Sequence, residues 1–376
     1  MDTIVTSTQG LVQFLLGLMP SIYQSDSLES LIGLFLQANG YPLPQHCQTK
    51  SPSAISRFLN IYKWPTRRVI RAIRNKIVEL LLAKVPPGRK GRKPLMEVVI
   101  DLTTLEKVGK FKGLNNLIRV YNGKRGLHIL VLYILLGNFR IPWGFRVYRG
   151  KGEKTPVELA QNLIRTIPKK LTDRFQVRIL ADTGFGSIEM LKWVHERKKI
   201  HAIIGIRNDR RLKSGSHVSQ IVKRGQQVYL QGMDFPVTLS WYWLKKEDGK
   251  KEKRFVVSTK PLSGRYIIMI GRRRWQIEGF FKTAKHRFGL HKFGQGTLLG
   301  VYRWLLLSLI AYLLAHWAYL STGLNNLPSW GEVARLALEN YFPQLVVMLL
   351  LIDIKRTHSL ARQQGLDITV SSWPYG

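Results

Sequence analysis

The sequence is poor in cysteine and in acidic residues. Cys47 is the single cysteine among 376 residues, which excludes a disulfide framework and a zinc module built on several cysteines. Only 23 Asp and Glu stand against 59 Lys and Arg, so the formal net charge is +36. A compact chain of this charge repels itself, and it usually has a polyanionic partner. Nucleic acid and an anionic membrane surface are the two classes to consider.

The first 49 residues lack Lys and Arg altogether. We therefore expect no secretory signal, because the positively charged start of such a signal is missing. Together with the single cysteine, this predicts a cytoplasmic, nucleoid-associated protein. Apolar runs at 11–19 and 28–36 predict two short helices in this segment.

Two further helices are predicted before residue 90. Ser51 followed by Pro52 is a typical helix start, and a longer helix is expected over 66–83. On this second helix Arg67, Arg71 and Arg74 lie to one side of the apolar face, where they could contact DNA phosphates. An ordinary solvated basic face would give the same pattern.

Residues 84–94, KVPPGRKGRKP, hold five Lys or Arg residues, including Lys90 and Arg92. Proline and glycine break this run, so it is predicted to be a loop or linker. A linker that follows DNA and a nuclear-localisation signal both fit its composition.

The centre of the chain has the pattern of an α/β domain. Strands are expected at 98–100, 129–136, 143–148, 177–180 and 202–206, and helices at 156–167 and 188–196. This order predicts a mixed sheet with helices packed on it. Residues 208–258 show only strands and turns, at 218–222, 227–230, 237–244 and 254–258, with a turn at Glu247-Asp248-Gly249, and are predicted to form an inserted β subdomain.

Residues 304–322 contain no Asp, Glu, Lys or Arg and are long enough to span a membrane. A helix buried in a large core has the same composition. Because Ser308 and His316 interrupt the run, and because it follows a basic helical region, we favour the buried helix.

Three carboxylates stand out in a chain with so few acids. Asp101 ends the apolar run VVID and Asp182 ends RILAD, so each is expected where a strand leaves the sheet. A helix over 272–288 places Glu278 on one side with Arg274, Lys282 and Lys285. Carboxylates gathered at strand ends can share divalent ions, since Mg²⁺ and Mn²⁺ prefer oxygen ligands. The alternatives are that the aspartates cap the elements that follow and that Glu278 forms ordinary ion pairs along its helix.

These segments resemble a bacterial DDE transposase of the insertion-sequence-four family and its transposon-five relatives. Asp101-Leu102-Thr103 matches the family's D-x-T motif, and Asp182-Thr183-Gly184-Phe185 matches D-x-G-[FY]. Arg274, Glu278 and Lys285 match the last three positions of Tyr-x2-Arg-x3-Glu-x6-Lys, whereas Gly271 stands at the Tyr position. The similarity runs from about residue 50 to 320.

The resemblance implies an RNase H-like catalytic core and a metal-dependent reaction. Asp101, Asp182 and Glu278 would hold two Mg²⁺ ions, with Mn²⁺ as a substitute. DNA would be cut at the inverted-repeat ends of a transposon and joined to target DNA by a homodimer, while Arg274, Lys282 and Lys285 bind phosphate. Trp241 and Trp243 are candidates to stack on an extruded base in a hairpin intermediate; as alternating strand residues, they could equally belong to the core or the sheet surface.

The resulting organisation has five regions: a helical DNA-binding region at 1–90, the first part of the core at 91–207, the β-rich insertion at 208–258, the second part of the core at 259–322, and a helical C-terminal region at 323–376. Three other functions remain open. They are a structure-specific nuclease of the same fold without strand transfer, a catalytically decayed DNA-binding protein, and a membrane-anchored basic protein.

Overall fold

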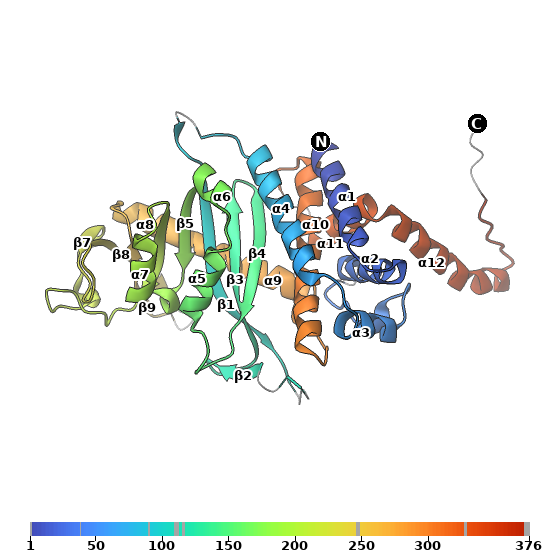
Figure 1. Cartoon of the computed structure of the whole chain (residues 1–376), viewed down its shortest axis with the longest axis horizontal. Coiled ribbons are helices and arrows are strands. Elements are labelled where there is room, and N and C mark those ends of the chain that lie inside the picture. The colour runs from blue at the N-terminus through green and yellow to red at the C-terminus, as the bar shows by residue number, and fades with distance from the viewer. Residues whose placement is uncertain are drawn as a thin grey trace. The chain divides into compact units, whose positions relative to one another are not determined.

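The computed structural model describes residues 2–37, 39–88, 91–108, 113–114, 117–245, 249–326 and 329–371 (Figure 1). The chain divides into two compact units. One is helical and joins residues 1–73 to residues 284–376, and the other comprises residues 74–283 and contains the sheet.

The helical unit is assembled around one long apolar helix, α10 (Leu298–Thr322), which is buried from Arg303 to Ala318. Three helices from the start of the chain pack on it, namely α1 (Asp2–Gly17), α2 (Ile22–Gln37) and α3 (Pro52–Asn60). The helices α11 (Trp330–Tyr341) and α12 (Pro343–Gln363) follow it. A short turn of 3-10 helix, η1 (Pro44–His46), lies between α2 and α3.

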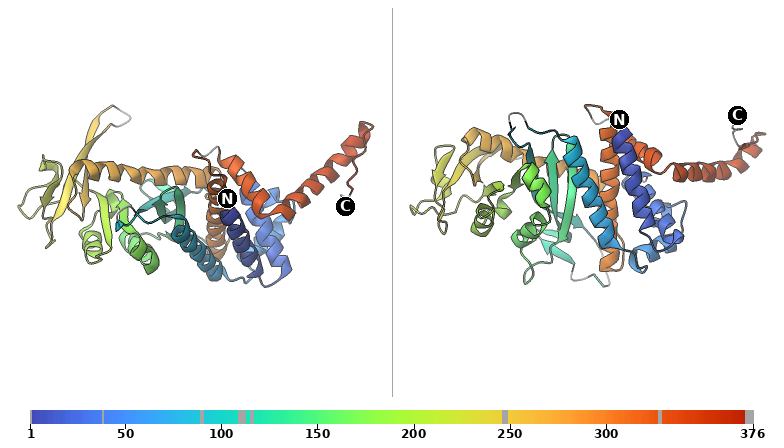
Figure 2. Two further views of the ribbon diagram at one scale, coloured as in Figure 1. Left: turned by 90° about the horizontal axis from the view of Figure 1, so that it is seen from above. Right: turned by 45° about the horizontal axis from the view of Figure 1, so that its top comes forward.

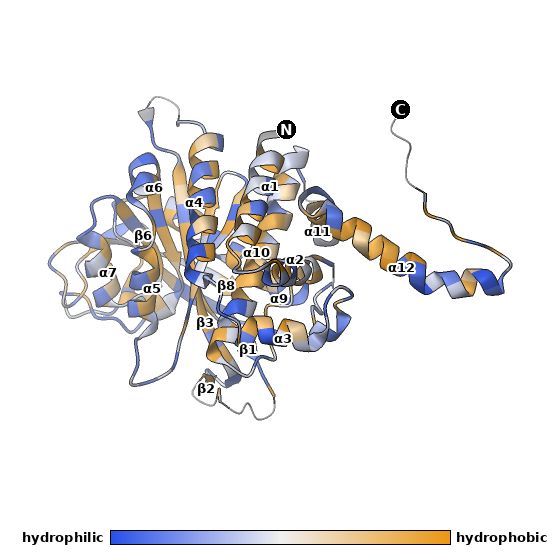
Figure 3. Ribbon diagram, turned by 45° about the vertical axis from the view of Figure 1, so that its right-hand side comes forward, coloured by the Kyte–Doolittle hydropathy of each residue, from blue (hydrophilic) through white to orange (hydrophobic). Residues whose placement is uncertain are grey.

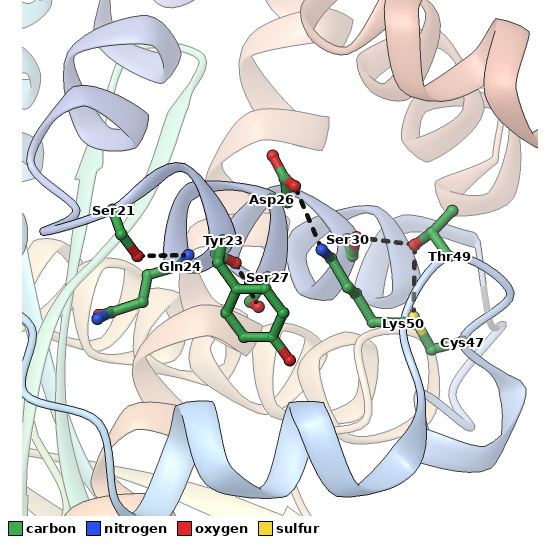
Figure 4. A network of polar contacts seen from close by, with 9 residues as sticks. All are labelled: Ser21, Tyr23, Gln24, Asp26, Ser27, Ser30, Cys47, Thr49 and Lys50. Carbon is green, nitrogen blue, oxygen red and sulfur yellow. Dashed lines mark hydrogen bonds and ion pairs between the residues drawn. The ribbon is translucent and has the colours of Figure 1, made fainter.

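Local signals in the sequence set the first helix boundaries. Ser51 caps α3 by accepting a hydrogen bond from the amide of Ala54 at 3.3 Å, with Pro52 in the first turn, as predicted. The predicted longer helix is α4 (Thr66–Lys84). Figure 4 shows how the first half and middle of α2 are tied to the segment before α3: Lys50 pairs with Asp26 at 3.2 Å, and Thr49 donates to Ser30 at 2.7 Å. The first lysine of the chain is therefore paired with an acid of the segment that has no Lys or Arg.

A buried guanidinium joins α10 to the turn between α3 and α4. Arg303 donates to the carbonyl oxygens of Leu59 and Tyr62, both at 2.9 Å, and also reaches Phe58, Trp64 and Thr66. Burial lowers the pKa of Arg303 to about 10. These carbonyl and hydroxyl oxygens satisfy the hydrogen-bond donors of the buried guanidinium.

By length and composition, α10 could cross a membrane, and the bent pair α11 and α12 passes the same test if counted as one span. In α10, 83% of the most apolar window is buried inside the protein. This agrees with the expectation of a core helix. Figure 3 shows that apolar residues of α12 gather in its first half.

The second unit is a nine-stranded mixed sheet. Its strands are β1 (Leu95–Glu106), β2 (Ile118–Tyr121), β3 (Lys124–Leu136), β4 (Phe139–Val147), β5 (Gln176–Ala181), β6 (Ile200–Ile206), β7 (Gln226–Val228), β8 (Val237–Lys245) and β9 (Lys251–Ser258). They are ordered β2-β3-β1-β5-β6-β9-β8-β7, and β4 pairs with β3. β1 is antiparallel to β3 and parallel to β5, and β5 is parallel to β6, which confirms the expected α/β, RNase H-like core.

Helices cover both faces of the sheet (Figure 2). On one face lie α5 (Pro156–Ile164), α6 (Lys169–Arg174) and α7 (Ile188–His195). On the other, α8 (Gly264–Arg272), the 3-10 turn η5 (Arg273–Trp275) and α9 (Gln276–His286) follow one another along nearly one line. Phe280 of α9 stacks on Tyr133 of β3 with ring centroids 4.7 Å apart, which fixes α9 to this face.

The structure differs from several expectations. Asp101 does not end its strand, because β1 continues to Glu106 in its pairing with β3. The strand expected at 218–222 is instead a 3-10 helix, η4 (Val218–Gln220). The helix expected over 272–288 is interrupted at η5. In the insertion, β9 pairs with β6, so its strands extend the main sheet rather than forming a sheet of their own.

One further difference concerns a boundary. The sequence predicts that residues 259–322 belong to the catalytic core, but α10 packs with the N-terminal helices. A long apolar helix is buried wherever enough apolar surface surrounds it, and composition does not say which unit supplies that surface. The turn residues Glu247 and Asp248 lie outside the described residues, although β8 and β9 pair up to Lys245 and Lys251 as a hairpin requires.

Candidate active site

Asp101 and Asp182 lie side by side on neighbouring parallel strands. The pairing of β1 with β5 ends at Ile100 and Ala181, and the two aspartates are the next residues on each strand. Asp182 leaves the sheet and caps the 3-10 turn η3 (Thr183–Phe185), accepting a hydrogen bond from the amide of Gly184 at 2.9 Å. Parallel strands place their carboxyl ends at one edge of a sheet, so the register brings together two acids far apart in sequence.

Glu278 joins this pair through an arginine. Arg274 Nη1 lies 2.9 Å from Oδ2 of Asp101, and its Nη2 lies 3.2 Å from Oε1 of Glu278. The side chains of Arg274 and Asp101 are only 17% and 14% exposed, whereas that of Glu278 is 43% exposed. The guanidinium of Arg274 therefore connects Asp101 of β1 with Glu278, which lies four residues after Arg274 in the first turn of α9.

The charges of the site shift the pKa of Asp101. Burial raises this pKa from 3.8 to about 6, and the negative charges of Asp182 and Glu278 add to the rise. The guanidinium of Arg274 and the amide of Leu102 oppose it. The same charge of Asp182, after the larger effects of burial and of Tyr148, raises the pKa of Tyr121. Burial and two nearby negative charges thus disfavour the ionised form of Asp101.

The donors at this site suit a hard divalent cation, because they are carboxylate oxygens, and two of them come from residues that follow the paired part of β1 and β5. In the conformation seen, however, no group of three His, Cys, Asp or Glu side chains within the described residues is close enough to hold a metal ion. Arg274 lies between the carboxylates of Asp101 and Glu278. The ligand chemistry fits a metal, and a positively charged side chain already neutralises two of the three ligands.

A cavity of about 330 Å³ opens beside Asp182. It is bounded by the ends of β5 and β6, by β8 and β9, and by η5, and Arg274 lines it together with Tyr242, Trp275 and Arg254. Gly271, which stands where the resembling motif has Tyr, also lines it. A Cβ atom at Gly271 would lie 3.6 Å from Val256, in ordinary contact, so a larger side chain there would project into the cavity.

The two tryptophans proposed to stack on a base lie on the other face of β8. Tyr242 and Leu244 line the cavity, and Trp241 and Trp243 alternate with them along the strand. Trp241 is held between Arg224 and Lys253, with cation–ring distances of 4.2 and 4.4 Å, and its Nε1 donates to Val222. Trp243 is 53% exposed and touches Trp241 edge-on.

The proposed DNA-binding side chains are distributed unevenly. Arg67 and Arg71 of α4 are exposed, but Arg74 packs on the ring of Trp143 in β4 at 5.2 Å. Lys282 and Arg92 are exposed and Lys285 is half-buried. Lys90 lies outside the described residues.

Sequence reasoning missed the aromatic side chains at the site. Tyr242 and Trp275 line the cavity, and Tyr121 lies near enough to Asp182 for its pKa to respond. The usable signal for Trp275 was its place on the same side of the helix expected over 272–288 as Arg274 and Glu278. Nothing in the sequence distinguished Tyr242 from Trp241, because the face of β8 that meets the cavity depends on its register with β9.

Comparison with known proteins gives one family match and one similar fold. The family model described as "Transposase DDE domain" matches residues 93–314, which include all three carboxylates. A solved structure, described as the cryo-EM structure of a piggyBac transposase synaptic complex with hairpin DNA, is similar in fold with a TM-score of 0.53. It is 14% identical, and the alignment covers 99% of this chain and 84% of that one. No curated protein matches the sequence.

The family match has direct consequences for chemistry. A DDE transposase domain carries endonuclease and transesterification activity on DNA, and such domains generally use divalent metal ions. The match spans more than half of the 376 residues, so the chain belongs to the DDE transposase family and is a DNA transposase.

Proposed function

We propose that this transposase cuts DNA at the ends of its own mobile element and joins the freed 3′ ends to target DNA, with Asp101, Asp182 and Glu278 as catalytic carboxylates. The observation that carries the assignment is the adjacency of Asp101 and Asp182 across β1 and β5, with Glu278 linked to Asp101 through Arg274. Three acids in a chain of net charge +36 would readily find separate basic partners. Their proximity is better explained by a shared task than by stability.

The donor set suits two Mg²⁺ ions, or Mn²⁺ in their place. When bound, such ions supply an activated nucleophile and stabilise the leaving oxygen. The chain's own residues would do the remaining work: the carboxylates hold the ions, and Arg274 and Lys282 bind phosphate oxygens of the DNA strand. The cavity beside Asp182 would exclude water from one side of that strand.

The finer relationship is to the insertion-sequence-four family and its transposon-five relatives, on the strength of the three motifs. The proposal therefore includes inverted-repeat ends as substrate, a hairpin intermediate, and a cytoplasmic, nucleoid-associated protein. Trp243 is the better candidate to stack on a base, because Trp241 is already held by two cations and a hydrogen bond.

Pairing of two DNA ends requires more than one copy, and we propose a homodimer. Supporting this, α12 exposes Val347, Leu350 and Leu351, which give it an apolar face for a second copy. Sedimentation of Leu350→Glu against wild type, with end DNA present, tests this assignment.

The function is tested with the full chain, a plasmid carrying the element's own flanking DNA, and Mg²⁺. Wild type should nick the ends and join a pre-cut end to plasmid; cleavage without joining would indicate a nuclease. Asp101→Asn, Asp182→Asn and Glu278→Gln should each abolish both reactions while end-DNA binding persists, because groups that act as a unit fail together. Asp234→Asn, which changes an exposed aspartate, is the control. A triad variant that cuts at the wild-type rate would exclude the assignment.

A further inference from the structure

We propose that Arg274 is an internal counterion of the catalytic carboxylates, that a divalent metal ion must displace it from Asp101 and Glu278, and that a DNA phosphate then takes up the freed guanidinium. This inference rests on the proposed function. It deepens that function by assigning Arg274 a part in controlling metal entry, beyond holding DNA.

The contacts of Asp101 leave little room for a metal ion while Arg274 is in place. Oδ1 of Asp101 accepts a hydrogen bond from the amide of Leu102 at 2.8 Å, and Oδ2 is held by Arg274 at 2.9 Å. Both carboxylate oxygens of Asp101 are therefore already hydrogen-bonded. The other guanidinium nitrogen holds Glu278, so the same side chain occupies two of the three proposed ligands.

Arg274 and a metal ion cannot share these oxygens at low cost. Both are cations, and at a separation of a few ångströms in a partly buried site their repulsion amounts to several kcal/mol. Arg274 and Asp101 are largely shielded from water, which strengthens the existing pair. The equilibrium is thus an exchange of one cation for another, rather than simple filling of an empty site.

The backbone that carries Arg274 is anchored independently. The preceding residue, Arg273, pairs with the buried carboxylate of Glu97 at 2.8 Å. Glu97 and Asp101 lie on one face of β1. Arg274 can therefore leave Asp101 by side-chain rotation while η5 stays on the sheet. Arg274 already lines the cavity beside Asp182, and a DNA strand bound at the site would lie next to this cavity.

This arrangement predicts coupling between metal and DNA. Metal binding frees Arg274, and a phosphate gives the freed guanidinium a new partner, so each ligand should favour the other by the same factor. A transposase of this kind would hold its site in a neutralised state until metal and DNA are both present.

The test is a titration of the full-length protein with Mn²⁺ in the absence of DNA, in which electron paramagnetic resonance measures the bound ion. Arg274→Gln removes the competing charge but keeps a side chain that can donate a hydrogen bond. We expect its Mn²⁺ affinity to be about ten- to a hundredfold higher than that of wild type. Arg272→Gln is the matched control, because it removes the same charge two residues earlier from an exposed side chain that lies over Tyr242. It should change the affinity less than about threefold.

A second measurement adds a short DNA duplex. In wild type and Arg272→Gln the duplex should raise the Mn²⁺ affinity, and in Arg274→Gln this coupling should be lost. Arg274→Lys keeps the charge but not the two-pronged contact, so its affinity should be intermediate; it also replaces the glutamine variant if that one does not fold.

Unchanged or weaker Mn²⁺ binding by Arg274→Gln in a folded protein overturns the proposal, because Arg274 would then support the metal site rather than compete with it. That result leaves the proposed function intact. A different result would contradict the proposed metal site itself: wild type shows no Mn²⁺ binding that is lost in Asp182→Asn. This inference would then be rejected with the metal site.

Discussion

Arg273 Nε lies 2.8 Å from Oε2 of Glu97, a carboxylate of β1 that is almost completely buried. The two partners differ in surroundings: Arg273 is 44% exposed, whereas Glu97 is 2% exposed. Burial raises the pKa of Glu97, and Arg273, Arg178 and Arg140 oppose the rise. Removing Arg273 should therefore lower the stability of the protein more than removing Glu97.

Arg273→Gln should destabilise the protein more than Glu97→Gln at neutral pH. The first leaves a buried negative charge with fewer neighbours and should cost about 1–3 kcal/mol, whereas the second frees an arginine that water can solvate and should cost less than about 1 kcal/mol. Because the raised pKa lets Glu97 take up a proton as the pH falls, the difference should shrink in acid. Urea unfolding at pH 7.5 and pH 4 measures it, and equal costs at both pH values would contradict this account.

Asp101→Asn should stabilise the metal-free protein at pH 7.5. The pKa of Asp101 is raised to about 6 in the folded chain, so the folded form binds a proton more tightly than the unfolded form, and stability is lost as the pH rises from about 4 to 6. Removing the ionised group should return about 1–3 kcal/mol at pH 7.5 and nothing below pH 4. Urea unfolding in a chelator checks this, with Asp234→Asn as the exposed control. A gain that is the same at both pH values would point to packing instead of charge.

The arginines of α4 should separate into two roles. Arg67 and Arg71 are exposed, and changing both to Ala should reduce the slope of log affinity for end DNA against log salt by about two. Arg74 packs on Trp143, so Arg74→Ala should mainly lower stability, by about 1 kcal/mol. Filter binding between about 50 and 200 mM salt measures the slope; wild type should lose about a thousandfold in affinity if six phosphates are contacted.

For this prediction Arg335→Ala is the control. Arg335 is an exposed arginine that already has a partner in Glu339 at 3.7 Å. An unchanged slope in Arg67→Ala/Arg71→Ala would remove this face from the DNA interface.

Trp243→Ala and Trp241→Ala should also behave differently. Trp243 is largely exposed, so its loss should leave folding intact and weaken hairpin formation, by the roughly 1–3 kcal/mol that a stacked base contributes. Trp241 stabilises the inserted segment, residues 208–258, through its contacts with Arg224, Lys253 and Val222. Its loss should therefore lower the melting temperature. Hairpin yield on a pre-nicked end and thermal unfolding distinguish the two effects. A normal hairpin yield in a folded Trp243→Ala protein would exclude stacking on this residue.

Gly271 offers a matched pair of substitutions at the cavity. Gly271→Ala adds a Cβ atom with ordinary contacts inside α8, so it should stabilise the protein by about 0.5–1 kcal/mol and leave cleavage unchanged. Gly271→Tyr should fill the cavity beside Asp182 and reduce cleavage about tenfold or more, if DNA borders that space. Cleavage rates on one duplex compare the two. Wild-type cleavage by a folded Gly271→Tyr protein would show that the cavity is not needed.

The sequence by itself determined the local elements and the chemical class of the site. Helix periodicity and the Ser51-Pro52 start specified α3, and apolar runs specified β1, β3, β5 and β6, because these signals act between residues a few positions apart. The spacing of Arg274, Glu278 and Lys285, together with the motifs around Asp101 and Asp182, indicated a DDE transposase, and the comparison confirmed this broader family. A short motif keeps its spacing within one element, and for that reason it can be read without the fold.

Only the tertiary structure decided which groups meet. The parallel register of β1 and β5 set Asp101 beside Asp182, the break at η5 directed Arg273 and Arg274 to two different acids, and the pairing of β8 with β9 turned Tyr242 toward the cavity and Trp241 away from it. A shift of one residue in any of these pairings would exchange the faces of a strand while leaving its local sequence pattern unchanged. Contacts of this kind depend on elements far apart in the chain, which is the physical reason that the sequence pattern did not contain them.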